Sequence, residues 1–106
     1  MESKIRVNFE SVEDVGIVTH YRGKPFTGIG YHLYKSGKLA NETEMVAGLK
    51  HGVSNYYDFE GNLSAKKKYI DDLYHGEQIY FATNGTIIRE SYYKKGDFIK
   101  VIHFDN

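Results

Sequence analysis

The sequence predicts an all-β protein in which tandem 24-residue β-hairpin repeats form a twisted antiparallel meander sheet. Two series of glycines carry the period, with 24 residues between successive members: Gly28, Gly52 and Gly76, and Gly37, Gly61 and Gly85. The composition agrees, because ten Tyr and six Phe suit a pleated, half-buried surface and eleven Gly suit tight turns. We therefore expect one domain spanning residues 1–106.

The first 21 residues lie outside the period and form the expected N-terminal cap. Ile5, Val7 and Phe9 alternate as in a strand, and Glu13-Asp14 is expected to turn the chain into a second strand over residues 15–21. Such an atypical segment is what ends a repeat array.

Three repeats follow, at residues 22–45, 46–69 and 70–93. In each repeat the second glycine lies in a three-residue hairpin loop, where glycine supplies the left-handed conformation. In the first repeat this loop pairs Tyr34 with Lys38 and Leu33 with Leu39. Because side chains alternate along a strand, positions 29, 31, 33, 39 and 45 and their equivalents should share one face, on which 13 of 15 residues are apolar.

Residues 94–106 are the expected C-terminal cap, with a last apolar strand through Phe98, Val101 and Phe104. The turns between hairpins are expected at Gly48, Asp72 and Gly96. The outer edge of the last strand is free to pair with a second copy of the chain, so a weak homodimer is one expected association. Charged residues on or beside this edge disfavour that pairing: Lys94, Lys95, Asp97 and Lys100.

The composition also excludes several classes of protein. The chain has no cysteine, which excludes disulfides and thiolate chemistry. Its start is too charged for a secretory signal, and no apolar run reaches the ~20 residues of a membrane span, so we expect a cytoplasmic protein with no membrane partner. The formal net charge is zero, which disfavours nucleic acid as a partner. The basic run Lys66-Lys67-Lys68 is split between two faces of a strand.

No residues suggest an enzyme, a metal site or a cofactor site. His51 and His75 occupy equivalent positions two strands apart, roughly 10 Å, which is too far for easy sharing of one zinc ion. We expect each of them to order the turn before its repeat glycine. Glu42 and Glu90 are separated by a repeat with Lys66 between them, which predicts an ion-pair ladder across the strands.

The less apolar face is the expected partner-binding surface. His32, Tyr56 and Tyr80 fall at the same repeat position and should form an aromatic ladder. Tyrosine offers a large rigid contact area and a hydroxyl group, and it is enriched where proteins meet. The other residues expected on this surface lie near the ladder or flank it: Tyr34, Asp58, Tyr92, Glu42, Lys66, Lys68 and Glu90.

The repeat resembles that of the MORN-repeat-variant family, the group of YwqK-like antitoxins. The resemblance rests on Gly23-Lys24-Pro25-Phe26-Thr27-Gly28 and on the order Leu49-Lys50-His51-Gly52, Asn55-Tyr56-Tyr57, Glu60-Gly61-Asn62-Leu63. It covers about residues 5–100 and implies a MORN-like sheet of hairpins. The third repeat departs from the pattern at Phe81-Ala82, and the first has His32-Leu33 where the family has paired aromatics.

The resemblance implies a function as an immunity protein or antitoxin, which binds and neutralises a cognate polymorphic toxin by protein–protein contact. The alternative is a MORN-like scaffold or a lipid-associating interaction module. The sequence has neither an amphipathic basic helix nor a polybasic cluster to attract anionic lipid.

Overall fold

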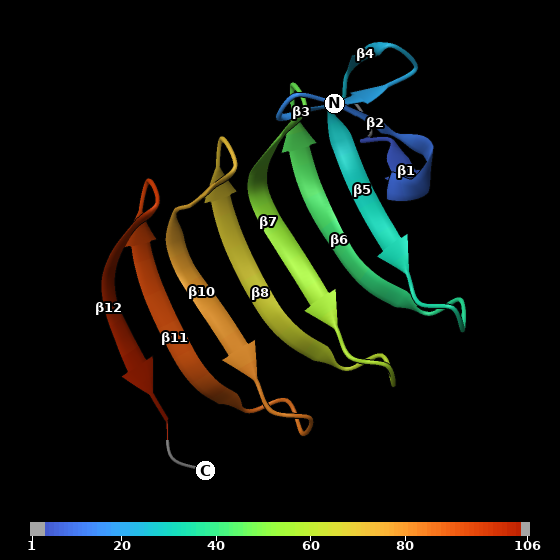
Figure 1. The fold of residues 1–106 in the computed structure, drawn as a ribbon. Coiled ribbons are helices and arrows are strands. Elements are labelled where there is room, and N and C mark those ends of the chain that lie inside the picture. Colours follow the sequence, from blue (N-terminus) through green and yellow to red (C-terminus); the bar gives the residue numbers. More distant parts are fainter. Residues whose placement is uncertain (1–3, 105–106) are drawn as a thin grey trace.

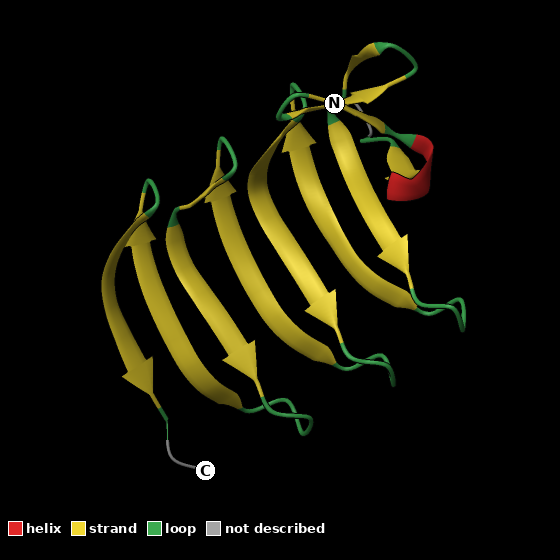
Figure 2. Cartoon of the chain, viewed as in Figure 1, coloured by secondary structure: helices red, strands yellow, loops and turns green. Residues whose placement is uncertain are grey.

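A computed structural model describes residues 4–104 of the chain. Within that range the regular elements are strands, apart from one short 3-10 turn, η1 (Phe9–Ser11) (Figure 2). The strands form one large sheet and one small three-stranded sheet. The predicted all-β class is confirmed, and no helix in the described part of the chain is long and apolar enough to cross a membrane.

The large sheet is a row of hairpins laid side by side in chain order (Figure 1). Its hairpin strands are β5 (Gly28–Leu33), β6 (Leu39–Val46), β7 (Leu49–Tyr57), β8 (Leu63–Ile70), β10 (Gly76–Phe81), β11 (Ile87–Lys94) and β12 (Asp97–His103). Short β9 (Leu73–Tyr74) also pairs with β8. At the other end β1 (Arg6–Asn8) runs parallel to β5, so the sheet is mixed. The antiparallel prediction is right for the hairpins and missed this strand.

The three hairpins repeat the same loop at intervals of 24 residues. The backbone N–H of Tyr34 donates to the Lys38 carbonyl at 2.8 Å, and the equivalent bonds join Asp58 to Asn62 at 2.9 Å and Ala82 to Thr86 at 2.8 Å. Gly37 has a φ of 91°, which an L side chain rarely adopts. The predicted hairpin loops and the predicted pair Leu33–Leu39 are therefore confirmed.

The predicted division of side chains between faces is wrong, because each hairpin contains a β-bulge. Leu33 pairs with Leu39, but the next pair is His32 with Asn41, so Ala40 is an extra residue. The same shift occurs between Tyr56 and Tyr57 and between Tyr80 and Phe81. One inserted residue reverses the alternation for the rest of the strand. As a result Met45 shares a face with Gly28, and Glu44 shares a face with Ile29.

The turns between hairpins lie where the sequence places them. Each is a two-residue turn with two positive φ angles, the geometry that matches the twist of antiparallel strands. The residues are Ala47-Gly48, Asp71-Asp72 and Lys95-Gly96. Gly48 also lies under the N-terminal cap, where its N–H donates to the Phe26 carbonyl at 2.8 Å and its carbonyl accepts from the Thr19 N–H at 2.9 Å.

The N-terminal cap contains the small sheet, formed by β2 (Glu13–Val15), β3 (Val18–Tyr21) and β4 (Lys24–Pro25). The turn expected at Glu13-Asp14 is wrong, since both residues lie in β2 and the chain turns at Gly16-Ile17, where Gly16 supplies a φ of 64°. Beneath the cap is the buried core, which consists of Val7, Phe26 and Met45 with Phe9, Val12 and Tyr21 packed against it.

The C-terminal end of the sheet has no comparable cover. The expected last apolar strand is present as β12, but every residue of it is exposed. Phe98 is 58% exposed and Val101 is 41% exposed. The outer edge of β12 has no strand beside it in the described part of the chain.

Candidate partner-binding surface

The large sheet presents two faces of different chemistry, and directly paired residues show which side chains share each face. We call one the aromatic face; its main side chains are His32, Lys50, Tyr56, Lys67, Tyr69, Tyr74, Tyr80, Arg89 and Tyr93. We call the other the charged face; its main side chains are Arg6, Glu42, Glu44, Lys66, Lys68, Glu77, Glu90, Tyr92 and Lys100. The predicted binding residues are therefore divided between two faces.

The predicted ladder of His32, Tyr56 and Tyr80 lies in one row across the aromatic face. The three side chains are not neighbours in that row, because each strand between them contributes a residue of its own. The pairing runs from His32 through Asn41, Tyr56, Ala65 and Tyr80 to Arg89. Small Ala65 leaves space between the two tyrosines, and a lysine from the same strand occupies it.

A second series of aromatic rings crosses the same face. The hydroxyls of Tyr56 and Tyr69 are 3.3 Å apart, and the ring of Tyr69 lies 5.2 Å from that of Tyr74. The series continues through Tyr93, at 5.1 Å from Tyr74, to Phe98, at 5.6 Å from Tyr93. These separations are typical of tilted and edge-to-face aromatic pairs. The rings thus form a continuous, rigid layer from β7 to β12.

Three cations lie on this aromatic layer. Lys67 is surrounded by tyrosines, with its ammonium nitrogen 5.0 Å from the ring centre of Tyr56, 5.4 Å from that of Tyr74 and 5.7 Å from that of Tyr80. Lys50 lies 5.1 Å from the ring centre of Tyr69. The guanidinium of Arg89 lies 4.0 Å from that of Tyr80. All these distances are within the range of cation–π attraction.

The cations and the hydroxyl groups shift one another's pKa values. Burial lowers the pKa of Lys67, but the 3.1 Å hydrogen bond that it donates to the Tyr74 hydroxyl and the neighbouring tyrosines raise it above its ordinary value. Burial raises the pKa of Tyr56, yet the Ser54 and Tyr69 hydroxyls and the charges of Lys50 and Lys67 bring it below its ordinary value. Burial also raises the pKa of Tyr69. Lys67 therefore remains charged at neutral pH.

A cleft of about 700 Å³ lies between the N-terminal cap and the aromatic face. The cap side includes Phe9 and Ile17, and the sheet side includes His32, Lys50 and Tyr56. The ring of Phe9 is stacked 4.8 Å from that of His32. The cleft and the aromatic face are thus one continuous surface that joins at Tyr56.

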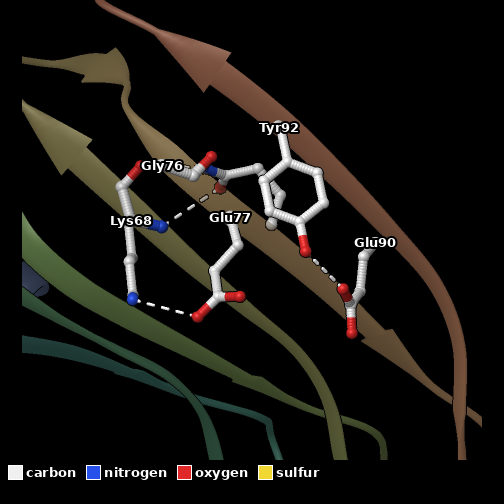
Figure 3. Close-up of polar contacts among 6 residues, drawn as sticks. Lys68, Gly76, Glu77, Glu90 and Tyr92 are labelled. Carbon is white, nitrogen blue, oxygen red and sulfur yellow. Dashed lines mark hydrogen bonds and ion pairs between the residues drawn. The ribbon is translucent and has the colours of Figure 1, made fainter. Parts of the chain in front are cut away.

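The charged face differs because its charges are paired within the protein. Lys68 donates to the Glu77 carboxylate at 3.1 Å, and the Tyr92 hydroxyl donates to Glu90 at 2.6 Å (Figure 3). Arg6 donates to Glu42 at 2.7 Å, which lowers the pKa of that carboxyl, and Lys4 forms an ion pair with Glu44.

The predicted ion-pair ladder of Glu42, Lys66 and Glu90 is wrong. The three residues share a row, but Asn55 lies between the first two and Ile79 between the last two. Lys66 forms no ion pair with any residue from 4 to 104. Antiparallel strands place repeat-equivalent residues two strands apart, so the intervening strand separates them.

Two further predicted residues serve the hairpin loops. The carboxylate of Asp58 accepts the backbone N–H groups of Glu60 and Asn62, both at 2.9 Å, and these bonds lower its pKa. The Tyr34 hydroxyl donates to the Tyr57 carbonyl at 2.5 Å, and its ring lies 4.5 Å from that of Phe59. Both side chains therefore have a local structural role.

Sequence reasoning missed Lys50, Lys67 and Arg89 and placed Tyr69 and Tyr93 on the core face. The bulge is the reason, because it moves the second strand of each hairpin to the opposite alternation. The signal available in the sequence was the 24-residue equivalence of Tyr69 with Tyr93 beside a cation in the same strand.

The histidines and carboxylates form no metal site within residues 4–104. His51 lies 3.6 Å from Asp71, and His75 accepts the Lys95 backbone N–H at 3.0 Å. Each of these two histidines therefore contacts the next turn between hairpins, one strand pair further along the sheet.

Comparison of the chain with models of protein families, with curated proteins and with solved structures finds no match. The resemblance to the MORN-repeat-variant family accordingly rests on its quoted motifs alone.

Proposed function

We propose that this protein is an immunity protein or antitoxin, which binds a cognate toxin domain through the aromatic face and the adjoining cleft and so blocks the toxin. The observation that carries the proposal is the continuous layer of tyrosines from Tyr56 to Tyr93, which remains accessible on one side of a single sheet. The family motifs add the expectation of a toxin as the partner.

Tyrosine rings held in this way suit tight protein binding. Their contacts with one another restrict their rotation, so little side-chain entropy is lost when a partner covers them. Tyrosine and arginine are also the residues on which binding energy most often concentrates. The cleft beside Tyr56 adds a concave region of about 700 Å³, which is large enough to receive a protruding segment of a partner.

The experiment is a co-purification of the tagged protein with the product of the adjacent upstream gene, used as a catalytically inactive variant so that the host survives. A stable complex is the expected result. Failure to associate, in monodisperse samples of both proteins, would refute the proposal. The scaffold alternative would then be tested by flotation with liposomes that contain anionic lipid.

The residues are tested with a matched pair of tyrosines from the same hairpin. Tyr80 lies on the aromatic face and Tyr92 on the charged face. We expect Tyr80→Ala to weaken the complex by about 2 kcal/mol, roughly thirtyfold in Kd, and Tyr92→Ala to change it by less than about 0.5 kcal/mol. Isothermal titration calorimetry with the inactive toxin measures both. Equal losses in the two variants would remove the aromatic face from the proposal.

A further inference from the structure

The charges of this neutral protein are sorted between the two faces of its sheet. On the aromatic face, the cross-strand rows contain Lys50, Lys67 and Arg89 and, within the described residues, neither Asp nor Glu. On the charged face, Lys4, Arg6 and Lys68 each pair with a glutamate. The formal net charge of zero therefore conceals a face with three unneutralised cations.

None of these three cations forms an ion pair with a carboxylate in residues 4–104. The Nε of Arg89 is buried and has no hydrogen-bond partner in the same range. Two aspartates line the nearby cleft, but both are engaged: Asp14 accepts from the Thr19 hydroxyl at 3.1 Å, and Asp72 accepts the Lys50 backbone N–H at 2.7 Å. A partly buried cation without a counter-charge is costly, and a carboxylate from a partner would offset that cost.

We infer that the partner is a protein with an acidic patch, whose Asp and Glu side chains bind Lys50, Lys67 and Arg89 over the tyrosine layer. This inference rests on the proposed function and specifies the chemistry of its partner. The tyrosine rings fix the cations from below, so the ammonium and guanidinium groups present their remaining donors outward to carboxylates.

Single-stranded nucleic acid is the other polyanion to consider, and the geometry disfavours it. Proteins that bind single strands stack bases on exposed aromatic faces. Here the faces of Tyr56, Tyr69 and Tyr80 are occupied by the protein's own cations, at 4.0 to 5.1 Å from the ring centres. Stacking a base would displace the cation needed for the phosphate, whereas a carboxylate needs only the cation.

The experiment measures binding of fluorescent poly-L-glutamate by anisotropy at low salt. Two triple variants lose the same charge: Lys50→Gln, Lys67→Gln and Arg89→Gln on the aromatic face, and Lys66→Gln, Lys68→Gln and Lys100→Gln on the charged face. We expect the first variant to bind roughly tenfold more weakly and the second to bind within about twofold of the unmodified protein. Equal weakening by both variants, or by neither, overturns the inference.

A measurement on the unmodified protein covers the case in which a triple variant does not fold. Poly-L-glutamate is titrated onto ¹⁵N-labelled protein, and we expect amide shifts at Lys50, Lys67 and Arg89 with little change at Lys66 and Lys68. Shifts concentrated on the charged face overturn the inference, and so does tighter binding of poly-uridylate than of poly-L-glutamate.

Failure of this inference is distinguishable from failure of the proposed function. A toxin complex that is unaffected by the aromatic-face triple variant retains the function and removes the acidic patch. Face-specific binding of poly-L-glutamate without any complex with the upstream gene product retains the acidic-partner chemistry and removes the toxin.

Discussion

The two ends of the large sheet are finished in opposite ways. At the N-terminal end, the outer edge of β5 is covered by the parallel strand β1, by η1 and by the small sheet, and the buried core lies beneath them. At the C-terminal end, β12 leaves its edge and both of its faces exposed. The same repeat unit thus adjoins a packed cap on one side and solvent on the other.

This difference shows where stability is concentrated in a sheet of identical hairpins. Each hairpin contacts its neighbours, and its side chains are mostly half-buried, so a strand contributes through its pairing. The fully buried apolar cluster is confined to the capped end. We therefore expect local opening to begin at β12 and the cap to persist longest.

The largest expected effect comes from removing one ring at each end. Phe26 is 2% exposed within the core, whereas Phe98 is 58% exposed. Phe26→Ala should lower the free energy of unfolding by about 3–5 kcal/mol, because it leaves a cavity among Val7 and Met45. Phe98→Ala should lower it by less than about 1 kcal/mol. Urea denaturation measures both, and similar losses would show that the ends are equally packed.

A smaller effect tests how closely the cap is seated. A methyl group at Gly30 would overlap the ring of Phe9, although the backbone there is not left-handed. Gly30→Ala should therefore cost about 1–3 kcal/mol of unfolding free energy. In a Phe9→Ala background the same change should cost almost nothing, since the obstructing ring is gone. A persistent cost in that background would mean that Gly30 is required for another reason.

The ion pair between Arg6 and Glu42 provides a pH test of the cap. The hydrogen bond from Arg6 holds the pKa of Glu42 below its ordinary value of 4.5, so its contribution to stability is present above that value and is lost as the pH falls through the folded-state pKa. Glu42→Gln should reduce the acid-dependent loss of stability. Because the pair is partly exposed, we expect a smaller effect than from either core change. Urea denaturation from neutral pH to well below 4.5 checks it; an unchanged pH profile would contradict it.

The smallest expected effect on stability is at the open edge. Ile99→Lys adds a charge to the outer strand at a residue that is 57% exposed, and it should change the free energy of unfolding by less than about 0.5 kcal/mol. If copies of the chain pair through β12, as we propose for a weak homodimer, the same change should abolish concentration-dependent association. Sedimentation equilibrium measures this. Association that survives Ile99→Lys would place the contact elsewhere.

The hairpins were predictable because glycine marks their loops. Gly37, Gly61 and Gly85 have positive φ angles that a side chain would strain, so the loop requirement is visible in the sequence. The two-residue turns were marked in the same way by Gly48 and Gly96. Local conformational requirements of this kind need no knowledge of the rest of the fold.

The faces and the cap were not predictable in the same way. The bulged residues Ala40, Ser64 and Ile88 share no chemistry, so nothing in the sequence marks the reversal that they cause. The parallel pairing of β1 with β5 joins segments separated by the whole small sheet, and no local pattern encodes such a contact. The aromatic ladder was predicted in its residues, but its cations followed only from the corrected register.

The pairing order of the sheet also has a consequence for how the chain folds. From β5 to β12 each strand pairs with a segment close to it in sequence, so the loops to be closed are short and their entropy cost is small. Each hairpin can therefore assemble as its residues leave the ribosome, against the hairpin made before it. The parallel strand β1 must wait for β5, and the order of synthesis thereby becomes an order of assembly that starts at the capped end.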